Sequence, residues 1–122
     1  MAPRTVSVRL AGSVAVRTST VSERVPARIP VTFHWNDGAT GSGTIRDIST
    51  AGCAVETDAP VPVGTLLLLQ LAPEGEPPID VDVGEVRARQ ARRLGVRFVR
   101  VGPTQADGLR GLVQRLIEAH RS

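Results

Sequence analysis

Residues 24–52 read RVPARIPVTFHWNDGATGSGTIRDISTAG. The β-branched and aromatic residues from 29 to 35 favour a strand. The tripeptide Asn36-Asp37-Gly38 tolerates positive φ and favours a tight reversal, after which residues 43–48 return as a second strand. The segment Asp47-Ile48-Ser49-Thr50-Ala51-Gly52 then turns the chain into a third strand at 53–57. This stretch therefore predicts three strands in succession.

Three further strands are expected downstream. Residues 65–71 form a continuous leucine-rich run, which is typical of a strand covered on both faces. Residues 79–89 alternate apolar with charged side chains, the pattern of a half-buried strand, and Gly84 within them predicts a bulge or a sharp bend. Residues 92–101 form the sixth strand. Six short strands separated by turns predict a mainly β fold, a six-stranded antiparallel β-barrel, because closure removes exposed strand edges.

The last element expected is a C-terminal amphipathic α-helix that begins at Pro103-Thr104. Its apolar side chains, with one histidine, fall on one face at helical spacing. They are Leu109, Leu112, Val113, Leu116, Ile117 and His120. Such a stripe must be covered, either by the barrel or by the same helix of a second copy, so a homodimer through this helix is one of the two outcomes.

Length and composition narrow the class of protein. At 122 residues the chain is long enough for one domain with a small core. No apolar run approaches the ~20 residues of a membrane span, and the first residues lack the apolar centre of a secretion signal, so a cytoplasmic location is expected. The single cysteine, Cys53, excludes an intramolecular disulfide and a cysteine-based metal cluster, and is expected in the core. No nucleophile, base or metal cluster occurs at workable spacing, so neither an enzyme nor a cofactor is expected.

Charge is distributed unevenly along the chain. All fifteen basic residues are arginine. Residues 1–36 carry a net charge of +4, residues 37–85 carry −8, and residues 86–122 carry +7. If the two basic ends meet in the fold, they create a site for an anion.

Arg24 and Arg28 are the first candidate binding residues. An arginine fork donates two hydrogen bonds to O6 and N7 of guanine, and it also stacks on a purine ring. Pro26 between the two arginines blocks a regular helix, so we expect an extended or turned loop to present them.

Asp47, Ser49 and Gly52 are the second group of candidates. A carboxylate accepts hydrogen bonds from the N1–H and N2–H groups on the other edge of guanine. In an extended chain Asp47 and Ser49 point to one side of the sheet, and Gly52 removes a Cβ where it would collide. A turn in which Asp47 and Ser49 only cap the backbone is the alternative interpretation.

The motif R-x-x-x-R at Arg24 to Arg28, followed by D-x-S-x-x-G at Asp47 to Gly52, resembles the PilZ domain family, bacterial receptors for cyclic di-GMP. Residues 94–98, LGVRF, and the amphipathic helix fit the same pattern, so the resemblance covers residues 24–122. It implies a PilZ-type β-barrel flanked by helix, with the ligand held between the barrel surface and the arginine-bearing loop.

The resemblance also implies a set of ligand-binding residues. These are Arg24, Arg28, Asp47, Ser49 and Gly52, with Arg46, Gly95 and Arg97 as accessory candidates. The arginines would bind guanine edges, phosphates and ring faces, Asp47 a guanine edge, and Ser49 a phosphate region. No catalytic residue and no metal ligand are implied.

A functional hypothesis follows for the N-terminal part. Residues 1–23 are interpreted as an extension or arm, a single strand or a hairpin. The loop at 24–28 would be mobile without ligand and ordered when ligand is bound. The arm would then change position, and a partner protein would recognise the new position. The resemblance is compatible with regulation of motility or biofilm formation, and with one or two cyclic di-GMP molecules at the site.

Two other functions are weighed. One is a PilZ-like protein–protein interaction module with weak or no ligand binding. The other, less favoured, is a nucleic-acid-binding small barrel that uses the arginines between 87 and 100. Barrels of that kind rely on stacking aromatic residues, and this chain has only Phe33, Trp35 and Phe98.

Overall fold

The structure is a computed structural model that describes residues 24–36 and 38–121. The arm expected at residues 1–23 lies outside the described residues. Six strands and one helix follow one another along the chain. They are β1 (Val25–Trp35), β2 (Ala39–Ile48), β3 (Gly52–Glu56), β4 (Leu66–Leu71), β5 (Ile79–Gln90), β6 (Arg93–Arg100) and α1 (Pro103–Arg121).

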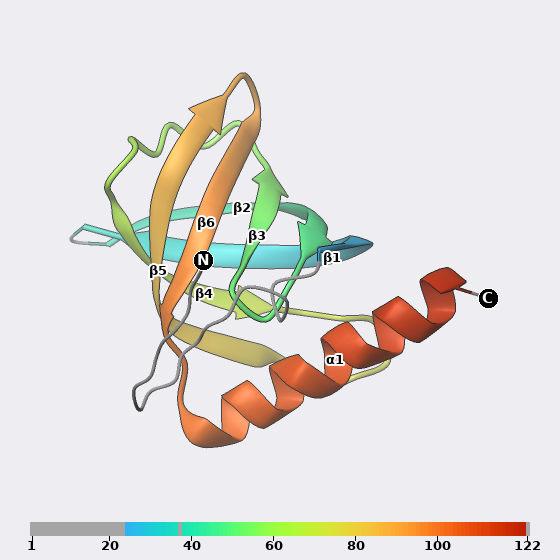
Figure 1. Cartoon of the computed structure of the whole chain (residues 1–122). Coiled ribbons are helices and arrows are strands. Elements are labelled where there is room, and N and C mark those ends of the chain that lie inside the picture. The colour runs from blue at the N-terminus through green and yellow to red at the C-terminus, as the bar shows by residue number, and fades with distance from the viewer. Residues whose placement is uncertain (1–23, 37, 122) are drawn as a thin grey trace, which may run out of the picture.

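The strands form a closed antiparallel barrel in the order β1-β2-β3-β6-β5-β4. Figure 1 shows the barrel above α1, with the β5–β6 hairpin rising on the side away from the helix. The predicted six-stranded antiparallel barrel with a C-terminal helix is confirmed. Closure leaves no unpaired edge among the described strands, which is the reason for which a barrel was expected.

Side chains alternate between the two faces of each strand, so the apolar ones fill the barrel interior. In β1, Val31 and Phe33 are buried while the residues between and beside them face outward. Gly84 in β5 lies where the pairing with β6 shifts register, and a Cβ there would come within 2.6 Å of Leu69 Cδ1. The irregularity predicted at Gly84 is therefore confirmed, and the glycine makes room for a core leucine.

β4 differs from the sequence-based expectation. The leucine-rich run predicted a strand covered on both faces, but alternate residues of β4 are exposed. Leu66 is 58% exposed and Leu68 is 47% exposed. The reason is that α1 packs against β1 and β5, which leaves the outer face of β4 without a covering element among the described residues.

The helix covers the barrel with its apolar face. Leu109, Leu112 and Val113 are buried in the same core as the strands, and the side chain of Gln105 accepts a 2.8 Å hydrogen bond from the backbone N–H of Asp80 in β5. Of the two predicted partners for the apolar stripe, the barrel is the one observed for these residues, whereas His120 is exposed. Among the described residues, no helix combines the length and the apolar character needed to cross a membrane.

Candidate functional site

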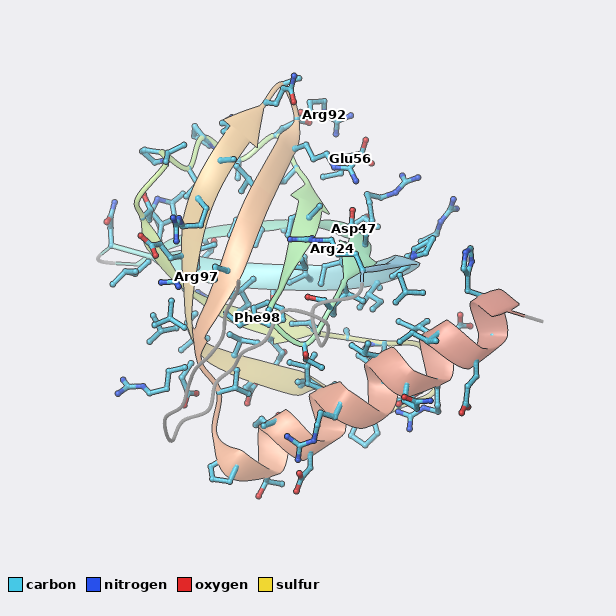
Figure 2. All side chains as sticks on the ribbon, in the orientation of Figure 1. Arg24, Asp47, Glu56, Arg92, Arg97 and Phe98 are labelled. Atoms are coloured by element: carbon cyan, nitrogen blue, oxygen red, sulfur yellow. The ribbon has the colours of Figure 1, made fainter. Side chains whose placement is uncertain are left out.

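An ion-pair cluster on the outer face of the barrel brings together three parts of the chain. Arg24 Nη1 lies 2.5 Å from Oδ1 of Asp47, and Arg93 Nη2 lies 2.9 Å from Oδ2 of the same carboxylate. Figure 2 shows Arg24 and Asp47 next to each other at the β1–β2 side of the barrel. Arg24 and Asp47 are 23 positions apart in sequence, so the two predicted motifs meet in space.

Irregular strand pairing places these side chains. Pro26 of β1 is in register with Asp47 of β2, and the β1–β2 register shifts between Pro26 and Ile29. The β2–β3 register also shifts next to Asp47. Such bulges re-aim side chains and are common beside binding sites. The two predicted arginines therefore lie beside the strand that carries Asp47.

The segment from Arg24 to Arg28 is not the loop that was expected. Residues from Val25 onward belong to β1, because Val25 and Ile29 are buried in the core at 2% and 4% exposure and anchor the segment on both sides of the bulge. Arg28 is exposed and forms no ion pair with another described residue, whereas Arg24 is already paired with Asp47. The two arginines of the motif thus have different environments.

Small residues form a floor beside Asp47. Asp47 is in register with Ala54 of β3, and Ala54 is in register with Gly95 of β6. Ala54 and Gly95 each lie between two core residues of their strands, so both positions point away from the core. Ala54 is nevertheless only 7% exposed, whereas Gly95 is partly exposed. A Cβ on Gly95 would make only ordinary contacts, the nearest at 3.6 Å from Ala88 Cβ. The described structure gives no internal steric reason for a glycine at 95, and its presence keeps the floor flat.

Ser49 is part of the turn and not of the exposed face. It is 1% exposed, and its hydroxyl accepts hydrogen bonds from the backbone N–H groups of Ala51 at 3.0 Å and Gly52 at 3.2 Å. Its own N–H donates to the carbonyl of Gly52 at 2.8 Å. For Ser49 the alternative of a backbone-capping turn describes the structure, and its contact with a phosphate stays a prediction.

Gly52 is required by the barrel itself. A Cβ at this position would lie 2.3 Å from the carbonyl oxygen of Val96 in β6. The expected close approach is therefore made by a neighbouring strand. Gly52 and Ser49 together hold the turn that carries the chain from Asp47 into β3.

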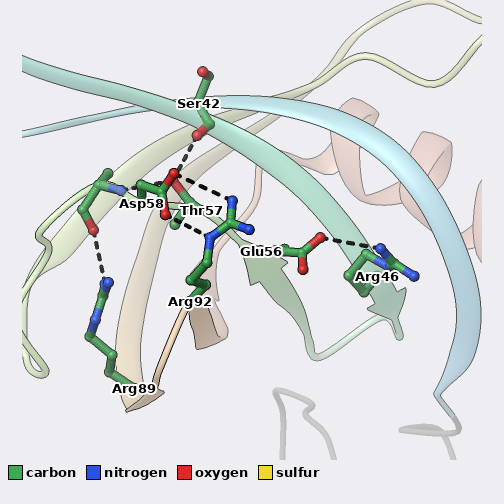
Figure 3. Close-up of polar contacts among 8 residues, drawn as sticks. Ser42, Arg46, Glu56, Thr57, Asp58, Arg89 and Arg92 are labelled. Atoms are coloured by element: carbon green, nitrogen blue, oxygen red, sulfur yellow. Dashed lines mark hydrogen bonds and ion pairs between the residues drawn. The ribbon is translucent and has the colours of Figure 1, made fainter.

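A hollow of about 560 Å³ lies between the β5–β6 turn and the neighbouring ends of β2 and β3. Its lining is largely charged and consists of Arg46, Glu56, Gln90, Ala91, Arg92 and Arg93. Arg46, an accessory candidate, lies 3.2 Å from Glu56, and Arg92 lies 2.6 Å from Asp58 (Figure 3). Because Arg93 also contacts Asp47, the hollow adjoins the ion-pair cluster.

The arginines between 87 and 100 do not form a free basic row. Arg89 donates to the carbonyl of Ala59 at 2.8 Å (Figure 3), and Arg97, the remaining accessory candidate, lies 3.4 Å from Glu85. Arg93 is the functional candidate that the sequence did not single out. The basic charge of residues 86–122 was a signal, but only the strand register shows which arginine reaches Asp47.

Cys53 lies directly under this face. It is fully buried, as expected for a core residue, and burial raises the pKa of its thiol to about 12. The positive charge of Arg24 opposes this rise in pKa and the negative charge of Asp47 adds to it. The thiol is therefore protonated and unreactive near neutral pH. The described residues contain no group of three or more His, Cys, Asp or Glu side chains that could hold a metal ion.

A closed six-stranded barrel with one covering helix, and a carboxylate between two arginines on its outer face, define a small β-barrel domain. The sequence matches the PilZ domain family over residues 20–118, and the chain belongs to that family. PilZ domains are non-enzymatic receptors, in agreement with the expectation that the chain is not an enzyme.

Solved structures share this fold. The PilZ domain of CeSA from a cellulose-synthesizing bacterium is 20% identical, with a TM-score of 0.63 over 81% of this chain and 99% of that chain. The PilZ domain with c-di-GMP of YcgR from Escherichia coli is 16% identical, with a TM-score of 0.67 over 82% and 92%. The Bacillus subtilis inhibitor of motility MotI/DgrA is also 16% identical, with a TM-score of 0.66 over 84% and 53%. Comparison with curated proteins gives no match.

Proposed function

We propose that this chain is a receptor that binds cyclic di-GMP on the face formed by β2, β3 and β6. The observation that carries the proposal is the contact between Arg24 of the motif R-x-x-x-R and Asp47 of the motif D-x-S-x-x-G. Family membership and the c-di-GMP named for the YcgR domain support the same ligand.

Each group on the face has a matching part of the ligand. The Asp47 carboxylate accepts from N1–H and N2–H of guanine, and the lack of a side chain at the partly exposed Gly95 leaves space for a purine ring. Arg28, exposed and without an ion pair among described residues, is available for a phosphate or for O6 and N7.

The response to the ligand centres on Arg24. To contact a phosphate or a guanine, its guanidinium must leave or share the Asp47 carboxylate, which it contacts at 2.5 Å. Val25 and Ile29 hold β1 in the core, so the movement falls on Arg24. We infer that a partner protein detects this movement. A cytoplasmic location and a role in motility or biofilm regulation stay predictions.

Calorimetric titration of the full chain with cyclic di-GMP, GTP and cyclic di-AMP tests the proposal. We expect binding of cyclic di-GMP and much weaker binding of the other two, because cyclic di-AMP lacks the guanine donors and GTP lacks the second base. Equal binding of all three, or no binding of cyclic di-GMP, would refute the proposed ligand.

The outer face of β4 favours a second candidate, a PilZ-like interaction module with weak or no ligand binding. Leu66 and Leu68 are exposed there, and Val63 in the preceding loop is 58% exposed. Exposed apolar side chains gathered on one face are typical of protein contact sites. A null titration with cyclic di-GMP, combined with intact folding, would make this the leading function.

A further inference from the structure

Asp47 has two cationic partners that come from different elements. Arg24 precedes β1 and contacts Oδ1, and Arg93 opens β6 and contacts Oδ2. An ionised carboxylate has about four acceptor sites. Each oxygen thus has one arginine donor among the described residues and keeps capacity for another donor. The Asp47 side chain is 24% exposed, so the carboxylate is accessible from solvent.

The two arginines differ in how firmly they are placed. Arg24 stands just before β1 and is not itself paired with another described strand. Arg93 is in register with Glu56 of β3 on one side and with Gln90 of β5 on the other. β3 lies between β6 and β2, so the Arg93 side chain spans β3 to reach Asp47. Its backbone is fixed by two neighbouring strands.

We propose that Arg93 is a positioning residue that fixes the orientation of the Asp47 carboxylate toward a guanine edge. The inference rests on the proposed function, because guanine is the base whose N1–H and N2–H donors match a fixed carboxylate. Asp47 sits next to a bulge, which re-aims its side chain, and the described groups that contact its two carboxylate oxygens are Arg24 and Arg93. When Arg24 turns to the ligand, Arg93 is the partner that remains.

The test compares the full-length wild-type chain with Arg93→Ala and with Arg92→Ala as the matched control. Both variants remove one positive charge from the same end of the hairpin, but Arg92 contacts Asp58 and not Asp47. Each protein is titrated with cyclic di-GMP and with cyclic di-IMP, whose hypoxanthine bases lack the 2-amino group. The readout is the ratio of the two affinities, because loss of charge alone weakens both ligands equally.

We expect Arg93→Ala to lower the preference for cyclic di-GMP about fivefold or more, since a carboxylate that is free to rotate no longer favours the second donor. Arg92→Ala should keep the wild-type ratio. Arg93→Lys, which retains one charged donor, should restore most of it. Circular dichroism should show an unchanged fold in all three variants, because both side chains are more than half exposed.

An unchanged ratio in Arg93→Ala, with both ligands still bound, overturns this inference and leaves the proposed function standing. An equal loss of ratio in Arg92→Ala also overturns it, because the effect would then come from general charge. A wild-type chain that binds neither dinucleotide overturns the proposed function, and the positioning role fails with it.

Discussion

Asp47 is in contact with arginines from both basic ends of the chain. The carboxylate comes from the acidic middle segment, and its two partners come from the segments on either side. The charge distribution predicted that the basic ends would form an anion site if they met. They do meet, and in the structure an acidic side chain lies between them, so a ligand must compete for or share these contacts.

Substitutions of Arg28 and of Asp47 test ligand binding without disturbing the fold. We expect Arg28→Ala and Asp47→Ala each to cost at least ~2 kcal/mol of affinity for cyclic di-GMP, because each loses a charged hydrogen-bonding group. Titration calorimetry measures the loss. Asp58→Ala is the control, since Asp58 pairs only with Arg92 among the described residues. Wild-type-like affinity in both variants would contradict the assigned site.

The buried thiol of Cys53 should make the stability of the protein depend on pH in alkaline solution. Its pKa is about 12 in the folded chain and 9.0 when unperturbed. Below pH 9 both states hold the proton and this group's contribution is fully present. As the pH rises from 9 to 12, the unfolded chain releases the proton first. The free energy of unfolding should therefore fall by about 1.4 kcal/mol per pH unit.

Urea unfolding at several pH values between 9 and 12 measures this slope. The chain has no lysine and no tyrosine, so no other side chain has an unperturbed pKa in that interval. Cys53→Ala should lower stability at neutral pH but give a flat profile across the interval. A variant with the wild-type slope would show that another group is responsible.

At the level of strands, alanine substitutions of Gly52 in β3 and Gly95 in β6 test the packing between these two strands. Gly52→Ala places a methyl group 2.3 Å from the carbonyl of Val96 and should destabilise the fold by about 1–3 kcal/mol or more. Gly95→Ala, on the paired strand, meets only ordinary contacts and should change the free energy of unfolding by less than about 1 kcal/mol. Chemical denaturation compares the two, and equal losses would contradict the described packing.

Strand periodicity predicted most of the fold because alternation records which face is buried. Residues 79–89 alternate, and β5 buries Ile79 and Val81 as that pattern predicts. At Gly84 the register shift changes the phase, so Gly84 and Val86 are buried. The leucines at 66 and 68 were placed wrongly because a continuous apolar run does not say whether anything covers the second face. For the site, motif order predicted that Arg24 and Asp47 lie close together. Arg93 was missed, since its contact depends on bulges and register that no local pattern encodes.

At the level of the whole molecule, a substitution in α1 tests whether the helix packs on the barrel of its own chain. Leu112 is 3% exposed and packs in the barrel core. Leu112→Ala should lower the free energy of unfolding by about 2–4 kcal/mol. The wild-type unfolding midpoint should be the same at low and high protein concentration, because the stripe is buried within one chain. Gln114→Ala, on the exposed side of α1, is the control.

A midpoint that rises with protein concentration, or a sedimentation shift caused by Leu112→Ala, would instead favour the homodimer through the helix. Such a result would mean that the stripe shared by Leu109, Leu112 and Val113 leaves the barrel to pair with a second copy.

The closed ring of described strands also limits how a partner can attach. Many proteins recruit an extended peptide by β-augmentation, in which the peptide hydrogen-bonds to a free sheet edge. Here every described strand already has two neighbours, so this backbone-to-backbone mode has no starting point. A partner must therefore recognise side chains. The arginines around Asp47 belong to that side-chain surface, so a change in their positions changes what a partner can bind.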